Sequence, residues 1–353
     1  MPDRDRPAPL PTRAADGTSR FRQVIADGEG ELLLFGITPP RLATPPERLP
    51  AIADATLARL DNLALDALLL YDIADETSRT DIERPYPFVE SWDPDIYFRN
   101  HLNEWDGQAI VYRCVGKYDT DQIGGFLGGA TDDVATVFVG AASATQPVKT
   151  SLQRAYQVHS DVRPAVPLGG VAIPERHTRK GDEHRRLMAK VDAGCSYFVT
   201  QVVFDVRAAK DLASDYAYTW AEERPDQRMA PLIFTMSLCG SIKSMEFIEW
   251  LGVDVPRWVR NELVRAHDPL TVSLSHSLGA ARELARFCRH LGIPFGFSVE
   301  SVSNRKVEIE ASVELARLIS ADLNRPRLGP LARISQVATL DGETTQGHLR
   351  DAR

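Results

Sequence analysis

The segment VAIPERHTRKGDEHRRLMAKVDAGCSYFVTQVVFD, residues 171–205, contains two short apolar runs joined by a charged stretch. The runs have the length of buried strands, and apolar residues in the stretch between them recur every three or four positions, as in an amphipathic helix. The first run leads into Pro-Glu-Arg-His, and the second contains Thr-Gln near its end. In barrels of alternating strands and helices, the catalytic and binding residues lie at such strand ends.

The same alternation extends over most of the chain. Between apolar runs lie helical patterns such as PERLPAIADATLARLDNL and LGAARELARFCRHLG, while GGFLGGA at 124–130 is interpreted as a loop. We predict a single-domain α/β fold, the (β/α)8 TIM barrel; a doubly wound sheet is the alternative, and no GxGxxG follows the first run. The eight predicted strands are Leu32–Thr38, Ala67–Ile73, Ala109–Val115, Thr136–Ala141, Leu168–Ile173, Tyr197–Val203, Pro231–Met236 and Pro294–Val299.

The composition bears on the domain bounds, the partners and the location of the protein. The Pro- and Arg-rich start predicts a disordered N-terminal arm over 1–22, followed by the barrel over 23–325 and a C-terminal tail over 326–353. A formal charge of −8 without a long basic run argues against a nucleic-acid partner. No apolar run is long enough for a membrane span, and four separated cysteines suggest neither a metal cluster nor disulfides. We therefore expect a cytoplasmic protein; a homo-oligomer is compatible with the sequence.

Candidate site residues are read from the predicted carboxyl ends of the strands. They include no metal-binding triad and no Ser-His-Asp nucleophile, and their many acceptors suit a heterocycle with several hydrogen-bonding edges. The candidates are Thr38, Arg41, Tyr71, Asp72, Asp75, Glu76, Arg113, Ser143, Glu175, His177, Thr200, Gln201, Ser237, Ser298 and Glu300.

Three motifs in order carry a family resemblance. IPERH, followed by KVDAG and TQVVFD, closely resembles the methylenetetrahydrofolate reductase family, and FGITPPR and VDVPRWV are weaker similarities. The resemblance implies a TIM barrel that passes a hydride from NADH or NADPH, through bound FAD, to 5,10-methylenetetrahydrofolate. It also implies that Gln201 binds the pterin, that His177 and Lys190 contact the flavin ribityl or phosphate, and that Glu175 and Ser143 belong to the cofactor site.

The chain departs from the family pattern at several of these positions. The glutamate presumed to be the acid falls at Gly36, the aspartate that faces the flavin falls at Ser143, and the flavin-stacking tyrosine falls at Ile173. Two alternatives therefore stay open: FAD is bound, or the nicotinamide transfers its hydride directly to the folate.

Other residues take roles from position alone. Asp72 and Glu76, in the loop after the second strand, are the predicted replacements for the missing acid, with loop ion pairs as the alternative. Arg113 either pairs with one of these acids or binds the folate glutamate, and Tyr71 and Glu300 are predicted to contact substrate.

Three functions fit this sequence. The first is a reductase that interconverts 5,10-methylenetetrahydrofolate and 5-methyltetrahydrofolate. The others are a tetrahydrofolate-dependent methyltransferase and a folate-binding protein without catalysis.

Overall fold

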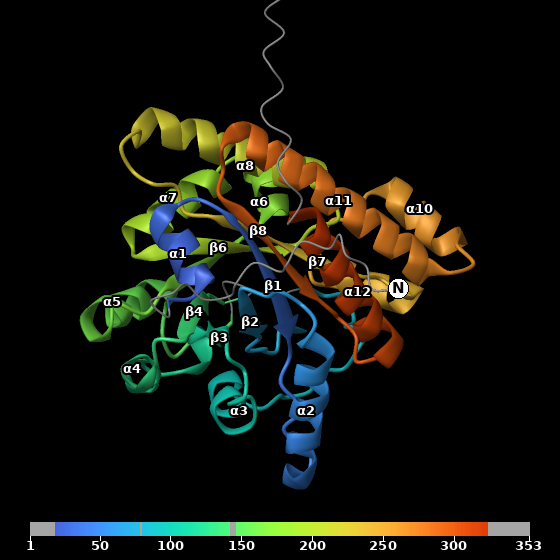
Figure 1. Ribbon diagram of the computed structural model, residues 1–353, viewed down its shortest axis with the longest axis horizontal. Helices are drawn as coiled ribbons and strands as arrows, with labels where there is room; N and C mark the ends of the chain where they lie inside the picture. Colours follow the sequence, from blue (N-terminus) through green and yellow to red (C-terminus); the bar gives the residue numbers. More distant parts are fainter. Residues whose placement is uncertain (1–17, 78–79, 142–145, 324–353) are drawn as a thin grey trace, which may run out of the picture.

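The protein is a closed barrel of eight parallel strands surrounded by helices (Figure 1). The computed structural model describes residues 18–77, 80–141 and 146–323. The strands pair in sequence order, and β8 closes onto β1. Their bounds are β1 Glu31–Ile37, β2 Ala67–Leu70, β3 Gln108–Cys114, β4 Val134–Val139, β5 Leu168–Ala172, β6 Cys195–Val202, β7 Leu232–Ser237 and β8 Phe295–Glu300.

The predicted barrel is confirmed, since each of the eight apolar runs overlaps one strand. Helices follow the strands and cover the outside of the barrel. Their bounds are α1 Arg20–Asp27, η1 Pro46–Arg48, α2 Leu49–Leu60, α3 Pro94–His101, η3 Val115–Lys117, α4 Thr120–Gly129, α5 Leu152–Val162, α6 Pro174–Lys180, α7 Glu183–Asp192, α8 Val206–Glu223, α9 Ile242–Trp250, α10 Arg257–Arg265, α11 Pro269–Leu291 and α12 Lys306–Leu323.

The prediction of a loop at 124–130 is wrong, because residues 124–129 form the last two turns of α4. A capping box satisfies the first turn: the Asp119 carboxylate accepts from the Gln122 backbone, and the Gln122 amide accepts from the Asp119 backbone. The helix also buries Phe126 and Leu127 against the core. Capping and burial offset the low helix propensity of the four glycines.

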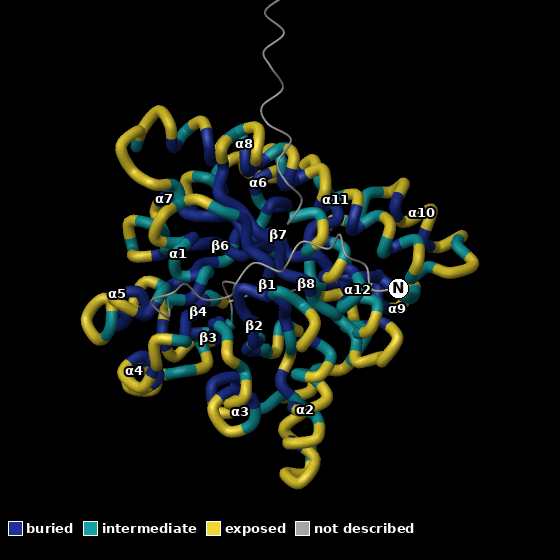
Figure 2. The backbone as a smooth tube through the Cα atoms, in the orientation of Figure 1, coloured by how far each residue is buried: buried dark blue, intermediate teal, exposed yellow. Residues whose placement is uncertain are grey.

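Alternate residues of each strand face two different cores. One core, which includes Leu32, Leu34, Leu69 and Tyr112, fills the inside of the barrel. The other core, which includes residues adjacent in sequence to these on the same strands, lies between the barrel and the helices. Figure 2 shows the buried strands at the centre and the exposed outer faces of the helices. None of the helices in the described ranges combines the length and hydropathy needed to cross a bilayer.

Helix α1 closes the amino-terminal end of the barrel, which corrects part of the disordered arm predicted over 1–22. Phe21 is fully buried and packs edge-on against Tyr197, with ring centroids 5.2 Å apart. The Ser19 hydroxyl donates to Gln108 Oε1 over 2.8 Å, at the start of β3. Sequence reasoning missed this helix because its apolar positions are few and follow a polar stretch. The predicted tail over 326–353 lies outside the described residues.

Replacing Phe21 with alanine tests the role of α1. Truncating a fully buried phenylalanine typically costs about 3–5 kcal/mol, so we expect the free energy of unfolding in urea to fall by that order. The matched control is Tyr218→Ala on α8, where the side chain is 60% exposed and the expected change is within about 0.5 kcal/mol. Equal stability of the two variants would contradict the assignment.

Candidate functional site

A carboxylic acid and a phenol lie together at the carboxyl-terminal mouth of the barrel. Gly36 on β1 pairs with Glu300 on β8, and Tyr71 follows β2. A Cβ atom at residue 36 would lie 2.9 Å from the Tyr71 ring and 3.3 Å from the Glu300 Cβ. Real Cβ atoms do not approach at the first of these distances, so glycine at 36 leaves the space that the two side chains occupy.

Burial controls the acidity of this pair. It raises the pKa of Glu300 to about 7, and a hydrogen bond from Tyr71 lowers that pKa only in part. Burial and the adjacent Glu300 charge raise the pKa of Tyr71 well above its usual value. The Tyr71 ring also packs against Tyr112, with centroids 4.9 Å apart. At neutral pH a large fraction of Glu300 is therefore protonated and able to donate a proton.

A second acidic group lies at the mouth where β5 and β6 end. Glu175, in the first turn of α6, is 1% exposed, and burial raises its pKa to about 7. The charge of Asp254 contributes to this rise. Gln201, near the end of β6, donates from Nε2 to the Leu251 carbonyl over 2.6 Å. The loop that follows α9 therefore interacts with both Glu175 and Gln201.

Two of the predicted residues lie on the outside of the barrel. The Asp72 carboxylate pairs with Lys117 Nζ at 2.5 Å and accepts from the Cys114 backbone at 2.8 Å. Arg113 pairs with Asp93 at 2.5 Å, and its guanidinium lies 4.3 Å from the centre of the Phe126 ring. Both residues follow an inward-facing tyrosine, so the strand alternation turns them away from the mouth. Both side chains form ion pairs, but not the predicted ones: Arg113 pairs with Asp93 rather than with one of the acids after β2, and Asp72 pairs with Lys117 rather than within its own loop.

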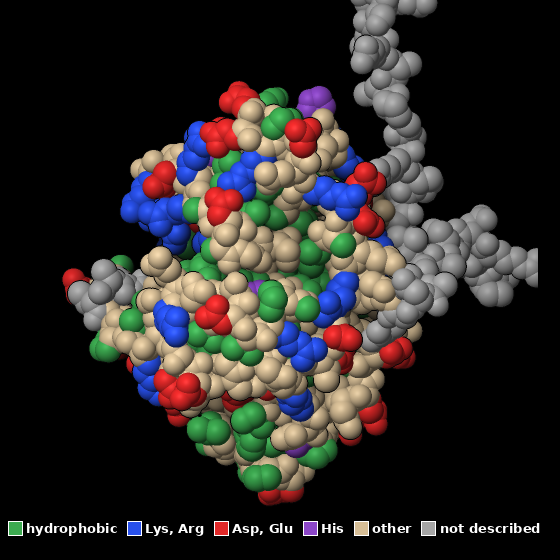
Figure 3. Space-filling model, turned by 90° about the vertical axis from the view of Figure 1, so that its left-hand side faces the viewer, with side chains coloured by type: hydrophobic (Ala, Val, Ile, Leu, Met, Phe, Trp, Pro, Cys, Tyr) green, Lys and Arg blue, Asp and Glu red, His purple; other side chains and the backbone are tan. Residues whose placement is uncertain are grey.

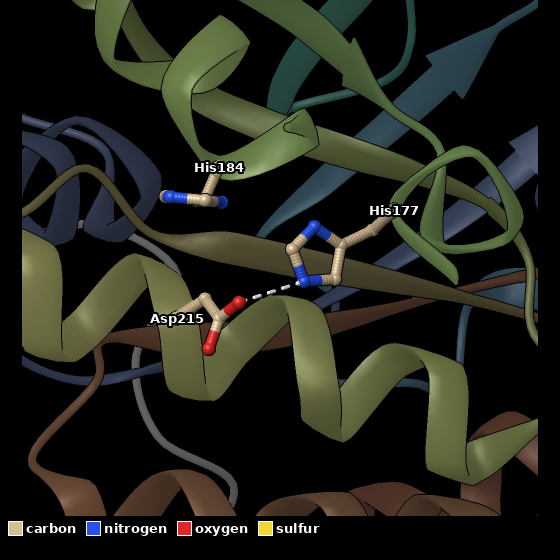
Figure 4. A group of neighbouring side chains, drawn as sticks. All are labelled: His177, His184 and Asp215. Atoms are coloured by element: carbon tan, nitrogen blue, oxygen red, sulfur yellow. Dashed lines mark hydrogen bonds and ion pairs between the residues drawn. The ribbon is translucent and has the colours of Figure 1, made fainter. Parts of the chain in front are cut away.

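Of the residues assigned to the cofactor site, Glu175 lies at the mouth, whereas His177 and Lys190 lie apart from it. His177, on α6, faces α8, where its Nε2 lies 3.1 Å from Asp215 Oδ2 (Figure 4). Lys190, on α7, donates to the Val171 carbonyl on the outside of β5, and burial lowers its pKa. Ser143 lies outside the described residues.

The segment after β2 extends along the rim of the barrel to α9. Glu76 is half-buried in it and lies close enough to Arg84 for their charges to interact. The Arg84 guanidinium stacks over Trp250, 5.0 Å from the ring centroid, and Trp250 Nε1 donates to the Ile82 carbonyl over 2.9 Å. This contact holds residues 82–84 against α9, beside the mouth.

Figure 3 shows the distribution of charged side chains on one face of the molecule. Basic and acidic side chains are interspersed there, and no extended single-sign patch covers it. A phosphate backbone would require such a patch.

Comparison with known proteins gives an informative match among the solved structures. No protein-family model and no curated protein matches the chain. An uncharacterized protein from Clostridium thermocellum, which binds two copies of 5-methyl-5,6,7,8-tetrahydrofolic acid, is 41% identical, with a TM-score of 0.76 over 86% of this chain and 99% of that chain. The dihydropteroate synthase of Xanthomonas albilineans is 12% identical, with a TM-score of 0.43 over 85% of this chain and 95% of that one, which supports no functional argument.

Neutralising Glu300 should change how stability depends on pH. A carboxyl with a raised pKa in the folded state destabilises the fold as pH rises from its unfolded pKa, about 4.3, through its folded pKa of about 7. Between pH 5 and pH 8, we expect the free energy of unfolding of the wild-type protein to fall by roughly 2–3 kcal/mol more than that of Glu300→Gln. Urea unfolding of both proteins at the two pH values measures this difference. Parallel pH profiles would show that Glu300 has an ordinary pKa.

Proposed function

This chain belongs to the same family as the methyltetrahydrofolate-binding protein of Clostridium thermocellum, and on this premise we propose that it binds a reduced folate in the mouth of its barrel. The identity of 41% extends over nearly the whole of that relative. The observation in this chain that supports the proposal is the group of polar side chains at the carboxyl ends of β5, β6 and β8. In barrels of this kind ligands bind at that end.

The mouth offers complementary groups to a pterin. The Gln201 amide uses one N–H on the Leu251 carbonyl, and a primary amide has a second N–H and an acceptor oxygen. Glu175, with a pKa of about 7, can donate or accept a hydrogen bond near neutrality. A pterin edge carries both donors and acceptors, so Gln201 and Glu175 together suit it.

The reaction that we propose is the interconversion of 5,10-methylenetetrahydrofolate and 5-methyltetrahydrofolate with NADH or NADPH. In the reductive direction, Glu300 donates a proton to N10, and the bond from N10 to the methylene carbon breaks to leave an iminium at N5. A hydride from the nicotinamide then adds to that carbon and gives the methyl group. The products are 5-methyltetrahydrofolate, the oxidised nicotinamide and an ionised Glu300, which regains a proton from solvent.

Glu300 suits the proton-donor role better than either acid predicted from the sequence. Its Cβ lies beside residue 36, where the resemblance places the family's acid, and its pKa is close to neutrality. The Asp72 carboxylate instead faces Lys117 outside the barrel. Glu76 lies in the rim segment rather than on a strand.

Two of the residues that the resemblance assigns to FAD make other contacts in this structure. His177 faces Asp215 on α8. Lys190, on α7, donates to a carbonyl of β5, so neither side chain donates into the mouth. Residue 173 is isoleucine, which cannot stack on an isoalloxazine as an aromatic ring does. We therefore propose direct hydride transfer, for which the site needs only to hold the nicotinamide and the folate in contact.

Substitutions at the mouth separate binding from catalysis. We expect Gln201→Ala to weaken binding of 5-methyltetrahydrofolate by about 1–3 kcal/mol, roughly 5- to 150-fold, in a calorimetric titration. We expect Glu300→Gln to keep most of the affinity but to lower turnover about 10²- to 10⁴-fold, because the amide cannot supply the proton.

The assay is NADH or NADPH oxidation that depends on methylenetetrahydrofolate. Asp72→Asn is the matched comparison: a larger loss of turnover in that variant than in Glu300→Gln would restore Asp72 as the donor. Folate binding without any nicotinamide oxidation would leave methyl transfer or binding alone as the function. Absence of folate binding would contradict the proposal as a whole.

The visible absorption spectrum and the effect of added FAD test whether the protein uses a flavin. Protein purified without added flavin should be colourless in the visible range, and adding FAD should leave its turnover unchanged. A flavin absorption spectrum, or activity that appears only with FAD, would contradict direct transfer.

A further inference from the structure

We propose that His177, His184 and Asp215 form a Zn²⁺ site between the helices outside the barrel. One ring nitrogen of each histidine and one carboxylate oxygen of Asp215 all lie within 4.8 Å of one another. Figure 4 shows the three side chains converging from α6, α7 and α8. Within the described parts of the chain this is the one group of three such ligands that meets this distance.

The histidines have hydrogen-bonding capacity that the protein does not use. His177 is 5% exposed, and its Nδ1 has no hydrogen-bond partner; the Nδ1 of His184 is likewise buried without one. The two rings lie edge to face, with centroids 5.4 Å apart. Buried polar nitrogens are normally paired, so one unpaired nitrogen on each of two neighbouring imidazole rings points to a ligand between these helices.

The donor set selects the class of metal. Two imidazoles and a carboxylate suit Zn²⁺, whose ligands lie about 2.0–2.2 Å away, whereas Ca²⁺ and Mg²⁺ prefer oxygen ligands. His177 Nε2 and Asp215 Oδ2 are 3.1 Å apart, near the separation of two ligands of one ion, and a His184 nitrogen lies within 4.8 Å of a ligand atom of each of the other two residues. Asp215 is 55% exposed on its side chain, which leaves a fourth position open to water.

Such an ion would join three helices outside the barrel, and α6 begins directly after β5, at the mouth. Glu175 lies two residues before His177 on the same short helix, so an ion at His177 would restrict the helix that carries Glu175. The ligands come from three separate helices without a compact spacing, and therefore the sequence alone gives no metal motif. The proposal does not depend on the folate assignment.

Metal titration of tag-free protein tests the site. We expect one Zn²⁺ per chain in a calorimetric titration, a rise in melting temperature with added Zn²⁺, and a visible spectrum of tetrahedral or five-coordinate type with Co²⁺. We expect His184→Ala and Asp215→Asn each to weaken Zn²⁺ binding about 100-fold or more, because loss even of an outer partner typically costs 10- to 100-fold.

The matched control is His276→Ala, which removes a histidine whose Nε2 lies 2.8 Å from Glu262 without a third ligand. That variant should bind Zn²⁺ as the wild type does. The proposal is overturned if the wild type shows no saturable binding, or if binding survives unchanged in both His184→Ala and Asp215→Asn. Folate titrations on the same proteins report the other site separately.

Discussion

The pairing of β1 with β8 is the constraint on which the site depends. It closes the barrel and places the backbone of Gly36 beside Glu300. Because residue 36 has no side chain, the Tyr71 ring and the Glu300 carboxyl share the space at the mouth. At this closure Glu300 is partly buried, and the desolvation raises its pKa to about 7. On our proposal, the acid role that the resemblance assigns to β1 passes to β8, since both strand ends open on one rim.

The barrel could be predicted from the sequence, because eight apolar runs of strand length separated by helical patterns fit few other folds. The direction of each strand-end side chain was harder to predict. Tyr71 and Tyr112 point into the barrel, so the next residue on each strand, Asp72 or Arg113, must point out. A parallel strand with both faces buried has apolar residues at every position and does not show which face is inside.

Contacts between helices were beyond sequence reasoning altogether. His177 and Lys190 belong to the motif that carries the family resemblance, yet in this chain they face Asp215 and the outside of β5. The packing of α6 and α7 determines where these two side chains point, and the local sequence pattern does not predict that packing. The burial of Phe21 was missed for a similar reason, because its partner Tyr197 lies far along the chain.

A structure of the complex with 5-methyltetrahydrofolate would locate the ligand without reference to turnover. We expect the pterin to lie in the mouth near Gln201, with N10 within about 3.2 Å of a Glu300 carboxyl oxygen. A folate bound elsewhere, or bound in the mouth with N10 out of reach of Glu300, would contradict it.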